Sequence, residues 1–251
     1  TEAADDAGQF RQVGQQPADA QHLAPARGLQ QAAHLVPALV LAVLGHHAED
    51  FDQFVDFAAM LLPFRGEGLD RHRHADVEIL TWVIDGAVEH RDSHGNASVL
   101  RPGQIQRMTA GTGIAHSERN AMPRASHTPS RVVQMWVATD TPGLTPGYAE
   151  VDLTDDLADG RLVLAASGRP GVAGAVSLAN RYSSLHIARL APGGRCELPA
   201  APFGHLYVPT GHLALTGADT ALVAGDAARF SGTDLRPADD GTSRRVRITR
   251  R

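Results

Sequence analysis

Two pairs of metal-ligating side chains stand out in the sequence, each pair spaced two positions apart. The first pair is His72 and His74, and the second is His116 and Glu118. Side chains at positions i and i+2 of a β-strand point to the same face, so each pair can present two ligand atoms to one point. Neutral imidazole nitrogens and a carboxylate suit first-row divalent metals that keep open positions. Together the four residues predict a metal site.

Neither pair is decisive alone. An isolated His-x-His within RHRH (71–74) is more typical of an exposed strand entrance, and His116 alone would suit a capped turn. The combination favours the metal site. Gly111 and Gly113 also allow a sharp turn just before the second pair.

Short β-type runs surround both pairs. Between residues 66 and 140 they are EILTWVI, GAVEHRD, SVLRPG, IQRMTAG and RVVQMWVAT, separated by Gly, Pro and Asn turns, with DSHGN as a hairpin turn. The Pro/Gly-rich stretch 141–150 is a plausible linker, and β-type runs resume after it with a weak internal repeat. Many short strands at regular spacing predict an all-β chain of barrels or sandwiches.

The first 60 residues have a different texture. QVGQQPADAQ is typical of a loop or a disordered segment, and LQQAAHLVPALVLAVL (29–44) suggests a helix interrupted by Pro37. The apolar run 35–45 is shorter than the ~20 residues that span a bilayer, so it predicts a partly buried helix or strand.

Composition limits the function classes. The net charge is −5 and no basic block is present, which argues against nucleic-acid binding through phosphate contacts. The single cysteine, Cys196, excludes an internal disulfide and fits a reducing compartment. We therefore expect a cytoplasmic protein without a membrane segment.

The span from 66 to 140 resembles the pirin family of the cupin superfamily. The first cupin motif, G-x5-H-x-H-x3-E, is met by Gly66, His72, His74 and Glu78. The next glycine, Gly86, lies one place later than the usual cupin spacing, as in pirins. The second motif ends H-x3-N, at His116 and Asn120, and TAGTGI-x-HSE (109–118) is a specific pirin signature.

The resemblance implies a bicupin, two β-barrels of the jelly-roll or double-stranded β-helix type packed together. Residues 66–140 would form the metal-binding barrel and 148–251 a degenerate barrel without a metal. Residues 1–65 are an atypical segment of uncertain structure, because they show few strand-like runs and no Trp or Tyr, unlike the opening segment of pirins.

The resemblance also implies one divalent metal held by His72, His74, His116 and Glu118. Iron(II) is favoured, and Cu, Ni, Mn and Zn suit the same ligands. Many cupins use the first-motif glutamate instead, here Glu78. The HSE form favours Glu118, which leaves Glu78 and Trp82 beside the site as pocket residues. If the alternation of faces is unbroken, Glu78 and Trp82 share the face of the two histidines.

Bacterial pirin-like proteins resemble quercetin 2,3-dioxygenases. The implied function is the opening of a quercetin-like flavonol ring by O2, with Glu118 as general base. The partners would be a small aromatic substrate and O2, and the chain a monomer. The alternative is a non-catalytic, redox-sensing regulator that acts through a protein partner; a third option is a metal-binding protein without activity.

The other histidines carry weaker expectations. His90 and His94 flank the hairpin turn and are expected to be solvated. His186, His205 and His212 are expected to be ordinary polar residues of the second half, and Cys196 is given no role.

Overall fold

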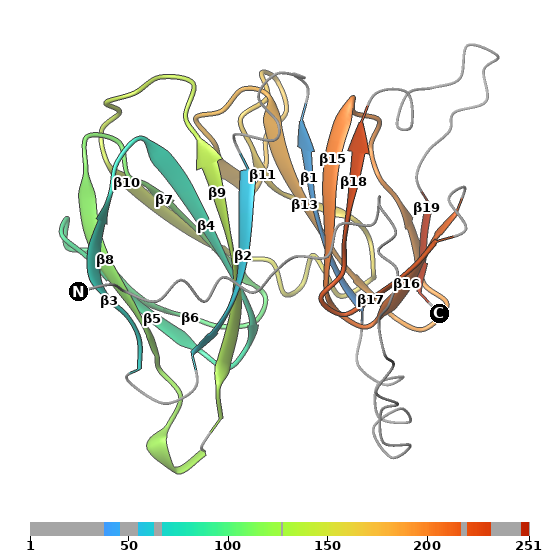
Figure 1. Ribbon diagram of the computed structural model, residues 1–251, viewed down its shortest axis with the longest axis horizontal. Helices are drawn as coiled ribbons and strands as arrows, with labels where there is room; N and C mark the ends of the chain where they lie inside the picture. Colours follow the sequence, from blue (N-terminus) through green and yellow to red (C-terminus); the bar gives the residue numbers. More distant parts are fainter. Residues whose placement is uncertain are drawn as a thin grey trace, which may run out of the picture. The chain divides into compact units, whose positions relative to one another are not determined.

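The computed structural model describes residues 38–45, 55–62, 67–126, 128–216, 220–231 and 247–250. These segments contain β-strands and one short 3-10 helix, η1 (Arg124–Ser126), and no α-helix among them (Figure 1). The predicted all-β class is therefore confirmed for the described part of the chain. The QVGQQPADAQ stretch and Gly66 lie outside the described residues.

Two compact units share the chain, and their boundaries interleave in sequence. Within the described residues, the first unit takes 55–155 and 165–183, and the second takes 38–45, 156–164 and everything from 184 onward. The sequence-based division at residues 65 and 148 stays a prediction.

Two sheets form most of the first unit. One has the order β10-β7-β4-β9-β2, with β2 (Val55–Leu62), β4 (Val77–Asp85), β7 (Gln104–Thr109), β9 (Ser130–Ala138) and β10 (Gly147–Asp152). The other has the order β3-β8-β5-β6, with β3 (Gly68–His74), β5 (Val88–Asp92), β6 (Ala97–Leu100) and β8 (Ile114–Asn120). A short parallel pair joins β11 (Val163–Ser167) to β12 (Val176–Ser177).

Apolar side chains from both sheets meet in two clusters. One cluster contains Val83, Val88, Leu100 and Val132, and the other contains Ile79, Met108, Ala110 and Ile114. Along β4, Thr81 lies between Ile79 of one cluster and Val83 of the other, on the same face. A polar layer is therefore enclosed between two apolar layers inside the first unit.

Strand β8 shows the alternation that builds this interior. Its burial alternates without exception, and the buried positions are Ile114, His116, Glu118 and Asn120. Residues between them are only partly buried. Period-two alternation of this kind places every second side chain against the core.

The apolar run of the N-terminal segment forms a strand, one of the two structures expected for it. Residues Ala38–Gly45 form strand β1 and not part of the suggested helix, and β1 pairs antiparallel with β15 (Phe203–Thr210) of the second unit. Pro37 precedes this strand and would disrupt a helix, and the β-branched Val40 and Val43 favour extended backbone. Strand β2 likewise pairs with β9, so this segment supplies a strand to each unit.

The second unit also contains two sheets. One includes β13 (Ser183–Leu190), β1, β15 (Phe203–Thr210) and β18 (Ala227–Ser231) as successive neighbours. The other has the order β14-β19-β16-β17, with β14 (Arg195–Glu197), β16 (His212–Thr216), β17 (Thr220–Val223) and β19 (Arg247–Arg250). Its core is aliphatic and contains Leu190, Leu198, Leu206, Val208, Leu213, Leu215 and Leu222.

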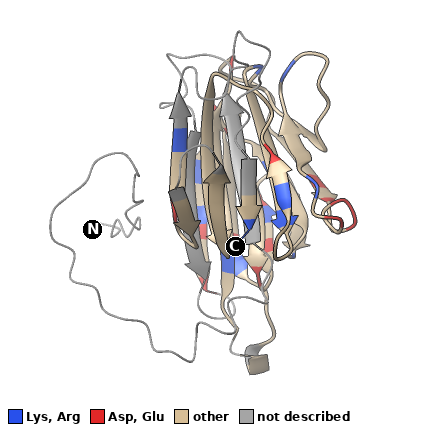
Figure 2. Ribbon diagram, turned by 90° about the vertical axis from the view of Figure 1, so that its right-hand side faces the viewer, with Lys and Arg blue, Asp and Glu red and all other residues tan. Residues whose placement is uncertain are grey.

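Basic and acidic residues are interspersed along the described strands in the view of Figure 2. No helix in the described ranges is both long and apolar enough to cross a membrane.

Candidate metal centre

Three histidines meet between neighbouring strands of the first unit. In the β3–β8 register His72 lies opposite His116, and His74 is two residues further along β3. The ring centroids are 4.7 Å apart for His72 and His74, 4.5 Å for His72 and His116, and 5.1 Å for His74 and His116. One ring nitrogen of each lies within 4.8 Å of the others. The geometry therefore brings together the three histidines selected from the sequence.

Hydrogen bonding leaves these imidazoles able to bind a metal. The Nδ1–H of His72 donates to the carbonyl oxygen of Asp70 at 2.7 Å, which leaves the lone pair on Nε2. A backbone acceptor of this kind commonly fixes the tautomer of a metal-ligating histidine. Nε2 of His74 and both ring nitrogens of His116 are buried without a hydrogen-bond partner. Unpartnered buried nitrogens that converge on one point fit a metal ion.

Burial keeps two of the histidines neutral. Desolvation, and then the neighbouring His72, lower the pKa of His74 to about 4. Desolvation lowers the pKa of His116 to about 3, with smaller contributions from His72, His90 and His74. Both rings are therefore unprotonated at neutral pH, which is the form that coordinates a metal.

Glu118 lies on the same face of β8 as His116 and is almost fully buried. Its Oε1 accepts a hydrogen bond from the Thr81 hydroxyl at 3.2 Å, and its Oε2 accepts one from the side-chain amide of Gln134. Desolvation raises the pKa of Glu118 to about 7 although both donors oppose this shift. The carboxyl group can therefore gain or lose a proton near neutral pH.

The carboxylate is grouped with a different pair of histidines. Its ligand oxygen lies within 4.8 Å of ring nitrogens of His90 and His116, and these three residues form a fully buried group. The four residues selected from sequence thus fall into two overlapping groups that share His116. Their assignment as ligands stays a prediction.

The expectation that His90 is solvated is wrong. His90 is fully buried, because β5 alternates and places Val88 and His90 on its inner face. Its ring lies 5.3 Å from that of His116 and 5.3 Å from that of Tyr148. The alternation of inward and outward positions along VEHRD (88–92) could have identified His90 as buried from the sequence. His94, in contrast, is exposed as expected.

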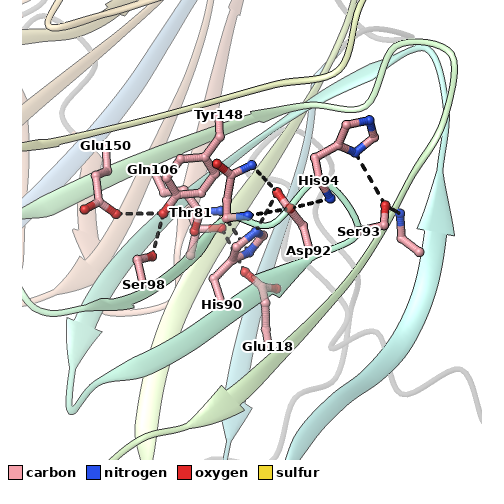
Figure 3. A network of polar contacts seen from close by, with 12 residues as sticks. Thr81, His90, Asp92, Ser93, His94, Ser98, Gln106, Glu118, Tyr148 and Glu150 are labelled. Atoms are coloured by element: carbon pink, nitrogen blue, oxygen red, sulfur yellow. Dashed lines mark hydrogen bonds and ion pairs between the residues drawn. The ribbon is translucent and has the colours of Figure 1, made fainter.

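A polar network surrounds His90 (Figure 3). The side-chain nitrogen of Gln106 lies 3.0 Å from Nδ1 of His90, and Asp92 Oδ2 lies 3.6 Å from its Nε2. Desolvation lowers the pKa of His90, and Asp92 opposes that shift. Nearby, the Tyr148 hydroxyl contacts Ser98 Oγ at 2.5 Å and donates to Glu150 at 2.7 Å.

Glu78 does not share the face of the histidines. The strand alternation is interrupted between β3 and β4, where Asp76 has a φ of 52°. Glu78 is fully buried and accepts hydrogen bonds from the Thr109 hydroxyl at 2.8 Å and from the backbone N–H of Ala179 at 2.7 Å. Burial raises its pKa, and a contact at 3.6 Å to Arg107 opposes the shift. Its contacts join β4 and β7 to the segment around Ala179.

The aromatic side chain beside the histidines is Trp136, which sequence analysis did not select. Its ring lies 5.1 Å from that of His74 in an edge-to-face arrangement, and it is 38% exposed. Trp82 is fully buried and, by alternation, lies on the face of β4 opposite Thr81. Trp136 lies two residues after Gln134 on β9, so strand alternation places both side chains on the same face. That spacing was the feature of the sequence that could have identified Trp136.

A glycine turn sets the start of β8. Gly111 has a φ of 48°, and a side chain there would meet the carbonyl oxygen of Leu144 at 2.0 Å. The N–H of Thr112 donates to that same carbonyl at 2.8 Å. Glycine is therefore required for the close approach that positions the strand carrying His116.

The motif residue Asn120 fixes the other end of β8. Its side-chain nitrogen donates to the carbonyl of Thr128 at 3.1 Å, and its oxygen accepts from the N–H of Met122 at 2.8 Å. These bonds give Asn120 a structural role in holding the chain that follows the strand.

The remaining candidates lie in the second unit. His186 and His205 are buried and His212 is exposed. His186 Nε2 lies 3.3 Å from Ser184 Oγ, an ordinary polar contact. Cys196 is buried in the aliphatic core, and burial raises its thiol pKa to about 11.

Residues 22–137 match the sequence model of the pirin family. This region of the chain belongs to that family. A Mycobacterium tuberculosis protein provisionally named quercetin 2,3-dioxygenase is 50% identical to this chain over 141 residues, which are 56% of this chain and 57% of that protein. The quercetin 2,3-dioxygenase of Escherichia coli K12 is 42% identical over 106 residues, 42% of this chain and 44% of that protein. The match thus spans about half the length of these relatives.

Solved structures confirm the fold. The bacterial pirin YhhW from Escherichia coli, determined in complex with nickel(II), has a TM-score of 0.60 and 24% identity, and the match covers 84% of this chain and 86% of that one. YhaK from Escherichia coli has a TM-score of 0.62 and 19% identity, over 82% and 85% of the two chains. The predicted cupin architecture is therefore confirmed.

Proposed function

We propose that this protein is a metal-dependent, pirin-like dioxygenase that opens the ring of a quercetin-like flavonol with O2. The observation that carries the proposal is the convergence of His72, His74 and His116 beside Glu118, with imidazole nitrogens left without hydrogen-bond partners. The names of the mycobacterial and Escherichia coli relatives support the same activity. That the protein is a soluble, cytoplasmic monomer remains a prediction. The alternative function, a redox-sensing regulator that acts through a protein partner, also remains a prediction.

The residues that would hold the ion are His72, His74, His116 and Glu118. Iron(II) is our first choice, and the nickel(II) complex of YhhW supports a divalent ion without fixing its identity. When bound, the ion would supply Lewis acidity that lowers the pKa of a coordinated substrate hydroxyl.

Glu118 is the proposed general base. Its carboxylate lies beside the histidines that would hold the ion, where a carboxylate can accept the proton of a coordinated hydroxyl. The hydrogen bonds from Thr81 and Gln134 fix the direction of the carboxylate, so it needs little reorganisation when it accepts the proton of the flavonol 3-hydroxyl.

Trp136 is the proposed binding surface for the flat substrate. It is an exposed aromatic ring in contact with His74, and stacking on such a ring adds affinity without a polar contact. The apolar clusters on either side of the polar layer would exclude water from the reacting groups.

Turnover of quercetin by the purified chain tests the proposal. The protein is stripped of metal, reloaded with Fe(II), Ni(II), Mn(II) or Cu(II), and assayed for parallel loss of quercetin absorbance and O2. We expect equal consumption of both with at least one ion, and none for a matched His116→Ala protein. Absence of turnover with every ion, in protein shown to be folded and metal-loaded, would falsify the enzymatic proposal.

A further inference from the structure

His90 completes a group of ligands that differs from the three-histidine group. His90, His116 and Glu118 place one ligand atom each within 4.8 Å of the others. Ligands bound to a common ion at about 2.1 Å are roughly 3 to 4 Å apart, so the ligand atoms would have to approach one another by at most about 1 to 2 Å. Side-chain rotations can supply a change of that size.

The hydrogen bonding of His90 is compatible with coordination through Nε2. That nitrogen is buried without a hydrogen-bond partner, and so is Oε1 of Gln106. Gln106 contacts Nδ1 of His90 at 3.0 Å through its amide nitrogen. Exchanging the positions of the amide nitrogen and oxygen of Gln106 lets Nδ1–H of His90 donate to Oε1. One rotation thus satisfies Gln106 Oε1 and leaves the lone pair on Nε2 of His90.

Negative charge near this group would compensate a divalent ion. Glu118 contributes a carboxylate, and Asp92 lies 3.6 Å from His90 Nε2 with a fully buried side chain. Asp92 accepts hydrogen bonds from the backbone N–H groups of His94 and Asn96 and from the Asn96 side chain, which hold it as an anion. A buried cation is tolerated where such partners are already in place.

We propose that the first unit contains a second, inner metal position formed by His90, His116 and Glu118. It overlaps the outer position of His72, His74 and His116, so a single ion occupies one position at a time because His116 belongs to both. Two histidines and one carboxylate form a ligand set that leaves open positions on iron(II). The inner residues are fully buried, whereas His72 and His74 are half-buried, so an inner ion would exchange slowly with solvent.

The inner metal position can be tested in a protein from which the outer position has been removed by substitution of His72 and His74. The proposal rests on metal binding by the proposed site, so the wild-type chain is titrated with Co(II) first, by calorimetry and visible absorption. The His72→Ala/His74→Ala protein is titrated next. We expect about one equivalent of Co(II) still to bind, more weakly than in the wild type, and a further loss of at least ~10-fold when His90→Ala is added.

A matched control adds His94→Ala in place of His90→Ala, because His94 is an exposed histidine four residues away. This triple variant should bind as the double variant does. The inner position is refuted if the double variant binds no Co(II), or if the His90 and His94 triple variants bind equally. Failure of the wild type to bind would instead refute the metal site of the proposed function.

Anomalous diffraction covers the case in which His90→Ala does not fold. Crystals of the His72→Ala/His74→Ala protein soaked in Co(II) should show a peak bonded to His90, His116 and Glu118. A peak elsewhere, or none, contradicts the proposal.

A gain-of-function variant provides a further test. Gln106→Glu supplies a carboxylate acceptor for Nδ1–H of His90, and it should tighten Co(II) binding in the His72→Ala/His74→Ala protein. Unchanged or weaker binding would count against coordination by His90.

Discussion

Polar side chains line the interior of the first unit, whereas aliphatic side chains fill the core of the second. The first encloses His90, His116, Glu118, Gln106 and Gln134 between its sheets. The second packs seven leucine and valine residues, with Cys196, between sheets of similar construction. Burying unpaired polar groups lowers stability, so their concentration in one unit indicates a site maintained for function. The proposed site therefore lies in the unit with the polar interior, whereas the core of the second unit is filled by aliphatic packing.

Among the substitutions that test this difference between the units, replacement of the shared histidine His116 should reduce metal affinity most. His116→Ala removes the ligand common to both groups, and we expect metal affinity to fall by more than about 100-fold. The measurement is calorimetric titration of metal-free protein. His186→Ala, a buried histidine of the second unit, is the control and should bind metal like the wild type. Comparable losses in both would remove the distinction between the units.

The pH dependence of metal binding should depend on Glu118. Its pKa is raised to about 7 by burial, so below pH 7 the carboxyl carries a proton that a coordinated ion must displace. Affinity is therefore full above pH 7 and falls about tenfold per pH unit below it, or about 100-fold at pH 5. His74 and His116, with pKa values of about 4 and 3, do not compete in this range.

Titrations at several pH values, for the wild type and Glu118→Gln, measure this effect. The glutamine variant should bind more weakly at pH 8 and lose the part of the slope due to Glu118. An identical slope in both proteins would show that Glu118 does not coordinate the ion.

Truncation of the aliphatic core should affect stability and leave the metal site intact. Leu213 is fully buried in the second unit, and Leu213→Ala is expected to lower the free energy of unfolding by about 2 to 5 kcal/mol. Urea denaturation measures the loss, and titration below the unfolding transition should give wild-type metal affinity. Val223→Ala, at an exposed position of β17, should change stability by less than about 0.5 kcal/mol. A weakened metal site in Leu213→Ala would show that the two units are energetically coupled.

The smallest expected effect concerns Trp136. Trp136→Ala should reduce kcat/KM for quercetin about tenfold, because the stacking surface is lost, while metal affinity is retained. Trp136→Phe should recover part of the loss. Steady-state assays of the metal-loaded proteins measure both. An unchanged kcat/KM would remove Trp136 from the substrate site.

Local motifs predicted the position of the histidines, since His72, His74 and His116 depend only on strand alternation and on the pairing of two strands. Glu78 was placed on their face because the alternation was assumed to be continuous. The left-handed backbone at Asp76 interrupts it, and no residue-level pattern revealed that interruption.

The residues missed by sequence analysis depend on pairing between distant strands. Trp136 and Gln134 reach the site because β9 pairs with β4, and Gln106 does so because β7 pairs with β4. His90 could have been found from the alternation of its own strand. For the apolar run that ends at Gly45 the sequence predicted a helix or a strand, and its neighbours β13 and β15, distant in sequence, decide between the two.

That early strand has a consequence for the folding of the chain. In the β1–β15 pairing Leu41 lies opposite Tyr207 and Val43 opposite His205, so more than 150 residues separate the partners. Contacts of such high sequence separation slow folding, because the loop entropy is lost before the contacts form. During translation β1 stays without its sheet neighbours until β13 and then β15 have left the ribosome. The unpaired apolar edge of β1 is then a target for chaperones during synthesis.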